Sequence, residues 1–470
     1  MRWPYAGGAW MASGISNLGI LCFNRGTGNG TALAKSLRLP VSFLCIGLLS
    51  ACSFSNQFMP TPNLYLEDES YEAVAPGNTD LQILYATDRI NESDDPARAV
   101  YRHGRSSNIE FGEVNIPVNP DINWKELDEE SDGERTRKLS YGEVKAVKVG
   151  QYPDTPYLFS VEDGQIIVDS DTQTEIAKAR ESFGSLIRQR LEQRTSKEAV
   201  LFVHGIFTTF DEAAQALGGI WHFLERKPVP ILYSWPAGAG GIRAFFIDGV
   251  AAEFTIFHLK ETLRTLFEMP EIEKIHIVAH SRGADVTASA LRELFIEQTA
   301  KNSMSKETFK IENLILAAPD LDFGVVEQRF LAEAFSSAIG KVTVYTTGAD
   351  KALSFAQLLT RGIQFGRIMF GNTNQRDRSI LERAGNVHFV EAEDIKSFTG
   401  HDYFVTDSAV SADMLTTIKH SAEPGSELRP LIHGRGAFWI LKEGYPQTVA
   451  AIKPRPYQRG NQRGNEESHR

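Results

Sequence analysis

The stretch Ile275-His-Ile-Val-Ala-His-Ser-Arg-Gly283 decides the fold of this chain. Its β-forming residues predict a strand that ends at Ser281, and a helical pattern follows over 284–295. A serine at the tip of a tight strand-to-helix turn is what an activated nucleophile needs in an open α/β sheet. Such a turn presses backbone against backbone, so the residues two positions before and after the serine must be small. Ala279 and Gly283 meet that requirement.

The segments around this turn predict a doubly wound, mostly parallel sheet flanked by helices. Buried strands alternate with helical segments in the order strand, helix, strand, helix, strand, serine. Two strands before the serine are expected at 199–205 and 229–236, and later ones at 311–320, 341–350 and 386–391. This α/β pattern predicts the α/β-hydrolase fold, in which nucleophile, acid and histidine follow one another along the chain.

Composition excludes several classes of protein. With 42% hydrophobic and 23% charged residues, the chain has the make-up of a soluble globular protein. A formal net charge of −11, with no basic stripe in the body of the chain, argues against a nucleic-acid partner. The three cysteines are too few for a disulfide scaffold and lack zinc-ligand spacing. The glycine cluster at 237–241 lacks the Lys-Ser/Thr of a phosphate loop. We therefore expect no metal and no cofactor.

The N-terminus carries the pattern of a targeting signal. Lys35 and Arg38 precede the apolar run 41–52, which is too short to span a bilayer and ends in Leu-Ser-Ala-Cys52. These four residues resemble the lipobox of bacterial lipoproteins, in which the cysteine is lipidated. The resemblance implies a lipid anchor on Cys52 in the bacterial cell envelope, and Ser53 after it implies the outer membrane, facing the periplasm. The alternatives are an ordinary cleaved signal and a buried apolar segment.

Composition also divides the chain into parts. Residues 1–52 form the signal region, and 53–79, rich in Asn, Pro, Ser and Glu, are expected to form a tether. The hydrolase domain is expected over 80–424, with N-terminal strands and a helix in 80–196 and the catalytic core in 197–424. Residues 425–470 form a C-terminal extension with a disordered end.

Three segments outside the catalytic core have predictions of their own. Thr172–Gln193 has the spacing of an amphipathic helix, with Asp171 or Thr172 as its N-cap. Asn119–Arg137 is charged and expected to be exposed. The apolar patch at 437–441 is expected to dock as a strand or short helix.

The candidate catalytic residues follow the serine in the order that the fold requires. We hypothesise that Ser281 attacks a carbonyl carbon, that His401 takes the serine proton, and that Asp350 orients the imidazole. Asp350 could instead cap the helix that follows it, and Asp320, the alternative acid, and Asp322 are its rivals because they follow the preceding strand. The rivals of His401 are His388, His420 and His433.

Two backbone amides are expected to stabilise the oxyanion. One belongs to Arg282, directly after the nucleophile. The other comes from the loop after the first core strand, where Ile206 or Phe207 would contribute it. His204 precedes the serine in the chain, so we expect its ring to support this loop. His280, beside the nucleophile, is expected to fix the turn.

Together these features resemble an uncharacterised bacterial family of α/β-hydrolase-fold proteins that are esterase- or lipase-like, here as a lipoprotein. The resemblance rests on motifs that follow one another between Leu81 and Tyr403: Tyr85-Ala-Thr-Asp-Arg89, Val203-His-Gly205, Tyr233-Ser-Trp-Pro236, Ala279-His-Ser-Arg-Gly283, Ala318-Pro-Asp320, Asp350-Lys-Ala-Leu353 and His401-Asp-Tyr403. It implies the fold and the Ser-Asp-His triad more firmly than a substrate. Family members often have Met where this chain has Arg282, a difference that bears on specificity.

The sequence therefore predicts a serine hydrolase of the cell envelope that acts through an acyl-enzyme. Its expected substrate is a small ester or a lipid-like ester, as for a carboxylesterase or lipase. A peptidase or a thioesterase would use the same residues. The alternative is a non-catalytic envelope lipoprotein that uses the fold as a binding or scaffolding module. An ordered contact between serine and histidine distinguishes the enzyme from the scaffold.

Overall fold

The structure is a computed structural model, which describes residues 56–63, 78–119, 122–132, 135–238, 244–301, 305–333, 335–350, 353–354, 366, 375–393, 400–442 and 444–446. All of these belong to one compact unit, residues 45–470. The predicted signal region, with Cys52, and the last residues of the chain lie outside the described residues. None of the helices in the described part combines the length and the apolarity that a membrane span needs.

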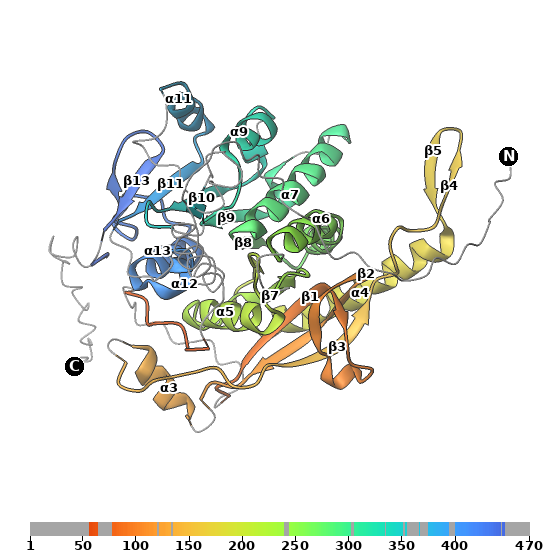
Figure 1. Ribbon diagram of the computed structural model, residues 1–470, viewed down its shortest axis with the longest axis horizontal. Coiled ribbons are helices and arrows are strands. Elements are labelled where there is room, and N and C mark those ends of the chain that lie inside the picture. The colour runs from red at the N-terminus through yellow and green to blue at the C-terminus, as the bar shows by residue number, and fades with distance from the viewer. Residues whose placement is uncertain are drawn as a thin grey trace, which may run out of the picture. The chain divides into compact units, whose positions relative to one another are not determined.

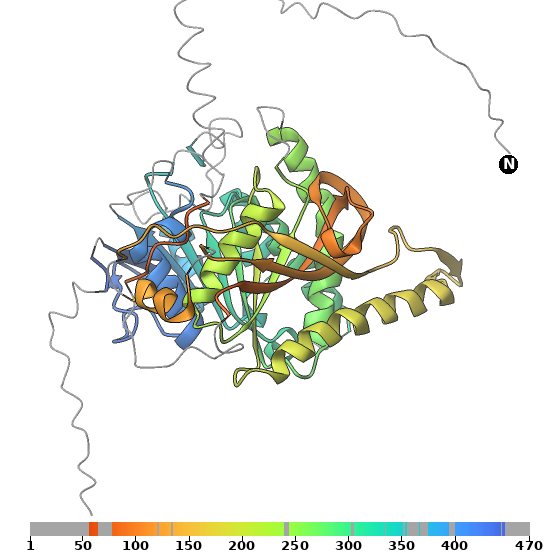
Figure 2. The same cartoon turned by 90° about the horizontal axis from the view of Figure 1, so that it is seen from below.

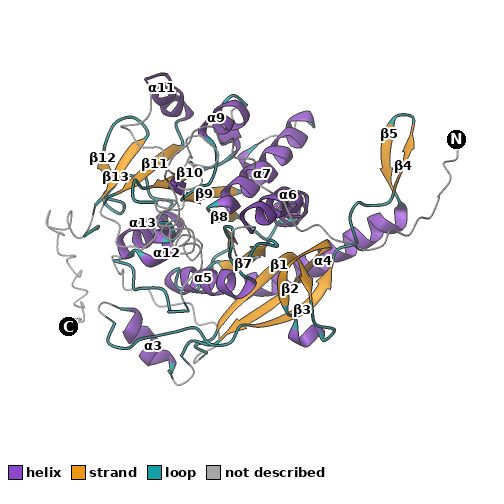
Figure 3. Cartoon of the chain, in the orientation of Figure 1, coloured by secondary structure: helices purple, strands orange, loops and turns teal. Residues whose placement is uncertain are grey.

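One mixed sheet organises the described chain (Figures 1 and 3). Its strands, from one edge to the other, are β12 (Ile432–His433), β13 (Phe438–Leu441), β11 (Val387–Ala392), β10 (Lys341–Thr346), β9 (Ile311–Ala317), β8 (Lys274–His280), β6 (Glu198–Val203), β7 (Val229–Ser234), β1 (Leu81–Asn91), β2 (Tyr101–Ile116) and β3 (Lys145–Gln151). All neighbours from β13 to β1 pair in parallel, and the pairs β12–β13, β1–β2 and β2–β3 are antiparallel. The predicted mostly parallel α/β sheet is confirmed.

Helices cover both faces of this sheet. They are α3 (Trp124–Ser131), α4 (Ser170–Glu192), α5 (Phe210–Phe223), α6 (Ala244–Glu268), α7 (Arg282–Ala300), α8 (Lys306–Phe309), α9 (Phe323–Val326), α11 (Gln375–Ala384), α12 (Tyr403–Thr406) and α13 (Ser408–His420), with short helical turns at Pro96–Arg98, Glu327–Leu331 and Phe335–Ala338. Two hydrophobic cores result: α4, α6 and α7 pack on one face, and α5 and α13 on the other. Along β6, Leu201 belongs to the first core and Phe202 to the second, which explains why the strand is hydrophobic without alternation.

The sheet continues beyond the predicted end of the domain at residue 424. β13 pairs in parallel with β11, Phe438 beside Phe389, and β12 pairs with β13. The fully buried Arg429 ties this segment down through a two-pronged ion pair with Asp413 at 2.9–3.2 Å. The apolar patch at 437–441 thus docks as a strand, and the first part of the predicted extension belongs to the domain.

Part of the predicted tether also packs on the domain. Over Asn56–Asn63, Phe58 and Met59 are buried against the second core, and Gln57 bridges to Ser140. The sequence did not reveal this packing because its two large apolar residues stand among polar ones.

Two predictions in the N-terminal part need correction. Asn119–Arg137, expected to be exposed, contains α3, which starts with a capping box between Asn123 and Glu126 and buries Leu127 completely. Helix α4 begins earlier than expected, because Asp169 is its N-cap and accepts the N–H groups of Asp171 and Thr172.

A two-stranded hairpin of β4 (Phe159–Glu162) and β5 (Gln165–Val168) stands apart from the main sheet at the N-terminal end of α4, as Figures 1 and 2 show. Its base meets α6 where the rings of Tyr157 and Phe257 lie 5.7 Å apart. The hairpin is remote from the loops that carry the predicted catalytic residues.

Strand order brings the candidate site together. From β6 the chain moves to β7 on one side, and β8 then returns to the other side of β6. The loops that leave the carboxyl ends of β6 and β8 therefore lie at a point where the strand order reverses, which is where open α/β sheets bind their ligands. Ser281 follows β8, and the loop with Ile206 and Phe207 follows β6.

Candidate active site

Ser281 sits on a strained turn between β8 and α7. Its φ of 52° and ψ of −125° are unusual for a residue with a side chain. Such a conformation costs on the order of 1–3 kcal/mol and persists only where the surroundings enforce it. Here they do, because the Ser281 N–H is bonded to the carbonyl of Ala317 on β9, and the Ser281 carbonyl accepts the N–H of Asp320.

Two glycines allow this turn to approach the loop after β6. A Cβ at Gly283 would lie 2.3 Å from the carbonyl oxygen of His204, and a Cβ at Gly205 would lie 2.8 Å from the Cβ of Ser281. A larger residue at Gly283 would displace the backbone of the loop after β6, and one at Gly205 would displace the side chain of Ser281. The small residues of the motif are thus explained by close contact between two loops.

Ser281, His401 and Asp350 form a continuous hydrogen-bonded chain. His401 Nε2 lies 2.9 Å from Ser281 Oγ, and His401 Nδ1 lies 2.7 Å from Asp350 Oδ2. All three residues are buried, with at most 2% exposed. Since a carboxylate only accepts, Nδ1 carries the proton and Nε2 can accept the serine hydroxyl. This is the geometry of a nucleophile, its base and the group that orients the base.

Asp350 performs both of the roles that the sequence left open. Its Oδ2 faces His401, and its Oδ1 accepts the N–H of Leu353 at 2.8 Å, as an N-cap does. The capping bond fixes the carboxylate plane. Tyr403, two residues after His401, fixes the other partner, because its hydroxyl donates to the Tyr345 carbonyl at 2.8 Å.

The rivals are engaged elsewhere. Asp320 Oδ2 lies 2.6 Å from a guanidinium nitrogen of Arg282. His388 lies on β11 beside Glu423, and burial lowers its pKa to about 4. The ring of His433 is bonded to the carbonyl of Gly436, and His420 is the last residue of α13. Among the candidates, the structure brings Asp350 and His401 to Ser281.

The side chain of Arg282 is held by two carboxylates. Besides Asp320, Asp285 approaches it at 3.3 Å. Burial lowers the pKa of Arg282, but the two carboxylates outweigh that effect and raise it. The three side chains together carry a formal charge of −1, so Arg282 is not an open anchor for an anionic substrate.

The structure separates the two candidates for the second oxyanion amide. The N–H of Phe207 donates to Asp248 Oδ2 at 2.9 Å, and the same oxygen accepts the N–H of Gly238 at 3.1 Å. Phe207 is therefore excluded while that bond exists. Within the described residues, no group accepts the N–H of Ile206 or of Arg282. Arg282 directly follows Ser281, and Ile206 directly follows Gly205, which lies against Ser281, so these two amides are the candidates for an oxyanion site.

Both histidines next to the triad support loops. The ring of His204 is stacked on Trp235, with centroids 5.3 Å apart and planes 7° apart, and the Trp235 indole donates to the His204 carbonyl at 2.7 Å. His280 Nε2 donates to the His401 carbonyl at 3.1 Å. Burial holds the pKa of His204 and of His280 well below the usual range, so both rings are neutral. His280 thus supports the histidine loop as well as the turn.

Sequence reasoning missed Asp248 and gave Trp235 no role. Asp248 lies within the first two turns of α6, where no motif marks it, although it is completely buried and holds two loop amides. Trp235 belongs to a motif quoted for the family resemblance, so its position was a usable signal. No group of three or more His, Cys, Asp or Glu side chains suited to a metal ion occurs in the described residues.

Residues 179–418, just over half of the chain, match the family described as alpha/beta hydrolase of unknown function (DUF900). The matched segment contains Ser281, Asp350 and His401, together with the loop after β6. A comparison with curated proteins finds no match.

Proposed function

The chain belongs to this family of alpha/beta hydrolases of unknown function, and we propose that it is a serine hydrolase that cleaves carboxylic esters through an acyl-enzyme. One observation carries the proposal: His401 contacts Ser281 Oγ at 2.9 Å on one side and Asp350 at 2.7 Å on the other. The strained turn at Ser281 and the two backbone amides near it accompany this alignment, and together they support an enzyme over a scaffold.

The geometry supports a two-step reaction. The Ser281 oxygen forms a bond to the ester carbonyl carbon while its proton passes to His401 Nε2. The carbonyl oxygen becomes an oxyanion and accepts the amide N–H groups of Ile206 and Arg282. Collapse breaks the carbon–alkoxy bond, and the alcohol leaves with the proton from His401.

A water molecule completes the cycle by attacking the acyl-enzyme. His401 takes a proton from that water and returns it to Ser281 as the acid product leaves. Throughout, Asp350 keeps the ring oriented and stabilises the imidazolium that forms twice. Each amide of the oxyanion hole is expected to lower the barrier by about 3–4 kcal/mol.

The proposed setting is the bacterial envelope, with a lipid on Cys52 and a small or lipid-like ester as substrate. This part rests on the sequence alone: the basic pair and the short apolar run that ends in Leu-Ser-Ala-Cys52. Metabolic labelling with a clickable palmitate analogue, compared between wild type and Cys52→Ser, tests the anchor. Equal labelling of the two proteins would refute it.

The enzyme proposal is tested by labelling purified protein with a fluorophosphonate and mapping the modified peptide. We expect stoichiometric modification of Ser281, since the reagent needs an activated serine and an oxyanion site. Protein denatured beforehand is the control and should remain unlabelled. Folded wild-type protein that takes up no label would overturn the proposal.

A further inference from the structure

We propose that Arg89 is a positioning residue that holds the oxyanion loop, His204–Thr208, in its reactive shape. The inference rests on the proposed function and adds a residue from β1, outside the matched segment 179–418. The Thr-Asp-Arg end of the Tyr85–Arg89 motif has no role in the triad, although it leads directly to this loop.

The side chain of Arg89 is 1% exposed, and all five of its N–H donors have acceptors. Two lie at the ends of the oxyanion loop: the Thr208 carbonyl at 2.8 Å and His204 Nε2 at 3.2 Å. The other three are Ser234 Oγ at 2.8 Å and the carbonyls of Ala237 and Arg102 at 2.7 and 3.1 Å. One planar group thus joins the oxyanion loop to the ends of β7 and β2.

The contact with His204 also fixes the state of that ring. A guanidinium can only donate, so Nε2 accepts and Nδ1 carries the proton, which it donates to the Gly205 carbonyl at 2.8 Å. Gly205 immediately precedes Ile206, whose amide is a proposed oxyanion donor. Arg89 therefore acts on the Ile206 amide through the ring of His204 and the carbonyl of Gly205, which belongs to the same peptide group.

The loop needs such support because its backbone is strained. Phe207 has a φ of 59°, which is unfavourable for a residue with a side chain. Asp248 holds the middle of the loop through the Phe207 N–H, and Arg89 holds both ends. Without Arg89, the buried carbonyls of Thr208 and Ala237 would lose this donor, and His204 Nε2 would keep only its contact with the Ser234 hydroxyl.

The charge of Arg89 also suits a residue that positions the oxyanion loop. Burial lowers the pKa of Arg89 to about 10, while the carboxylates of Asp88 and Asp248 oppose that shift. The side chain stays cationic at neutral pH, and its charge balances the buried Asp248 that binds the other side of the loop. The two ions thus hold the loop between them.

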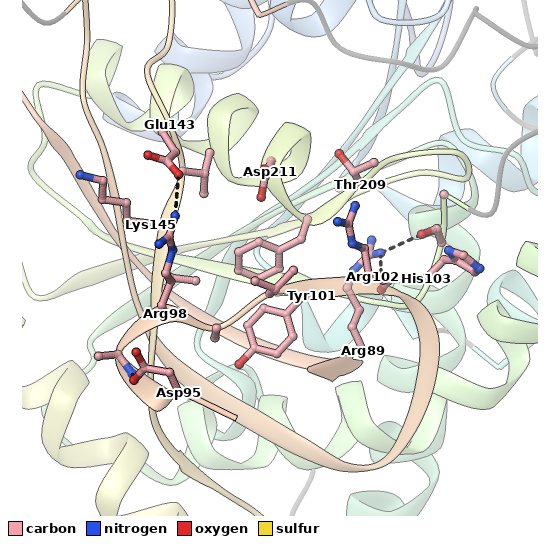
Figure 4. Close-up of a pocket in the computed structure, with 18 residues that line it drawn as sticks. Arg89, Asp95, Arg98, Tyr101, Arg102, His103, Glu143, Lys145, Thr209 and Asp211 are labelled. Carbon is pink, nitrogen blue, oxygen red and sulfur yellow. Dashed lines mark hydrogen bonds and ion pairs between the residues drawn. The ribbon is translucent and has the colours of Figure 1, made fainter. Parts of the chain in front are cut away.

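A cavity of about 780 Å³ gives access to Arg89 from the surface (Figure 4). Arg89 and Ala237 line it together with Tyr101 and Arg102, and the bonds from Arg89 to the carbonyls of Ala237 and Arg102 appear there as dashed lines. A small solute that enters this cavity can therefore reach the space that a shortened side chain would leave.

The chain offers a matched control in Arg226, which is 2% exposed. It donates to the carbonyls of Asn78, Thr79 and Asp80 just before β1, and to His222, at 2.9–3.4 Å. Arg89 and Arg226 are thus buried arginines that bind carbonyls and a histidine at opposite ends of one strand. Only Arg89 contacts the oxyanion loop.

The test compares Arg89→Lys with Arg226→Lys on p-nitrophenyl acetate and on a trifluoromethyl ketone, which forms an oxyanion on the serine. We expect Arg89→Lys to lower kcat roughly 10- to 100-fold with KM within about 2-fold, and to weaken the ketone in proportion. Arg226→Lys should lower the free energy of unfolding without lowering kcat relative to KM in this way. Equal kcat in wild type and Arg89→Lys would overturn the inference.

Arg89→Ala supplies an independent readout, with folding checked by near-ultraviolet circular dichroism. Millimolar guanidinium should restore part of its kcat through the cavity and should not activate Arg226→Ala. Equal activation of both variants would count against a positioning role. Wild type that neither turns over esters nor takes the fluorophosphonate defeats the proposed function itself. Active wild type with an unimpaired Arg89→Lys defeats only this inference.

Discussion

The hydrogen-bonded chain of side chains Asp350–His401–Ser281 has a close counterpart elsewhere in the molecule. Asp88 Oδ2 lies 2.8 Å from His258 Nδ1, and His258 Nε2 lies 2.9 Å from Thr155 Oγ1. In the catalytic candidate the matching distances are 2.7 and 2.9 Å. In both chains the carboxylate and the imidazole are buried. Distance alone does not tell the two chains apart.

The surroundings of the two hydroxyl groups distinguish the two hydrogen-bonded chains. Thr155 donates its hydroxyl hydrogen to the Ser107 carbonyl at 2.8 Å, so that hydrogen is held away from the ring of His258. Ser281 instead stands at a strained turn, points its hydroxyl at His401, and has the amides of Ile206 and Arg282 beside it. A triad thus needs a transferable proton and a site for the oxyanion, and three residue types in line are not enough.

The largest expected effect comes from removing the hydroxyl of Ser281, compared with removing that of Thr155. Ser281→Ala should lower kcat on p-nitrophenyl esters by roughly 10⁴- to 10⁶-fold. The matched change Thr155→Val keeps the shape of the side chain and should leave kcat within about 2-fold of wild type. Steady-state kinetics on both folded variants decide the matter. Equal losses would mean that the two chains are not distinct in function.

Next in size is the removal of each carboxylate charge. Asp350→Asn should lower kcat by roughly 10⁴-fold, because the amide favours the wrong tautomer of His401. Asp88→Asn should instead lower the free energy of unfolding by about 1.5–3 kcal/mol, with kcat within about 3-fold. Urea unfolding and kinetics are measured on the same samples. A loss of catalysis in Asp88→Asn as large as in Asp350→Asn would contradict the assignment.

A smaller effect separates Asp350 from its rival acid. Asp320 pairs with Arg282, and an asparagine side chain can still accept from that guanidinium. Asp320→Asn should therefore lower kcat by no more than about 10-fold, far less than Asp350→Asn. If the two losses proved equal, Asp320 would be part of the catalytic relay.

The smallest effect concerns acid stability, not rate. Burial lowers the pKa of His388 from 6.5 to about 4, so the unfolded chain binds its proton first as the pH falls. The free energy of unfolding must then decrease between pH 6.5 and pH 4. His388→Asn should reduce the loss between pH 7 and pH 5 by about 1–2 kcal/mol. Urea titrations at both pH values check this, and kcat at pH 7 should be unchanged.

The sequence predicted the parts of the site that depend on strand ends and small residues. The turn at Ser281 was predictable because only small neighbours fit it, as the 2.3 Å approach at Gly283 shows. Asp350 and His401 were predictable because parallel strands place their carboxyl ends at one edge of a sheet. The order of serine, acid and histidine along the chain then assigned a role to each of the three residues.

What escaped prediction depends on side chains that meet across distant elements. Asp248 holds the Phe207 amide from α6, and Arg89 reaches the same loop from β1. Arg89 stands in a motif quoted for the resemblance and Asp248 in none, but the role of either buried charge is recognised only when its partners are known. For strand β13 the sequence left strand and short helix open, because four apolar residues are too few to show a period.

The packing of Asn56–Asn63 on the domain limits how far the proposed enzyme can lie from a lipid on Cys52. Phe58 is buried in the domain, and only four peptide steps separate Cys52 from Asn56. Fully extended, they span about 14 Å. A lipid on Cys52 would keep the catalytic domain against the bilayer surface, where encounter with substrate becomes a search in two dimensions. Esters dissolved in that membrane would then be met far more often than esters free in the surrounding fluid.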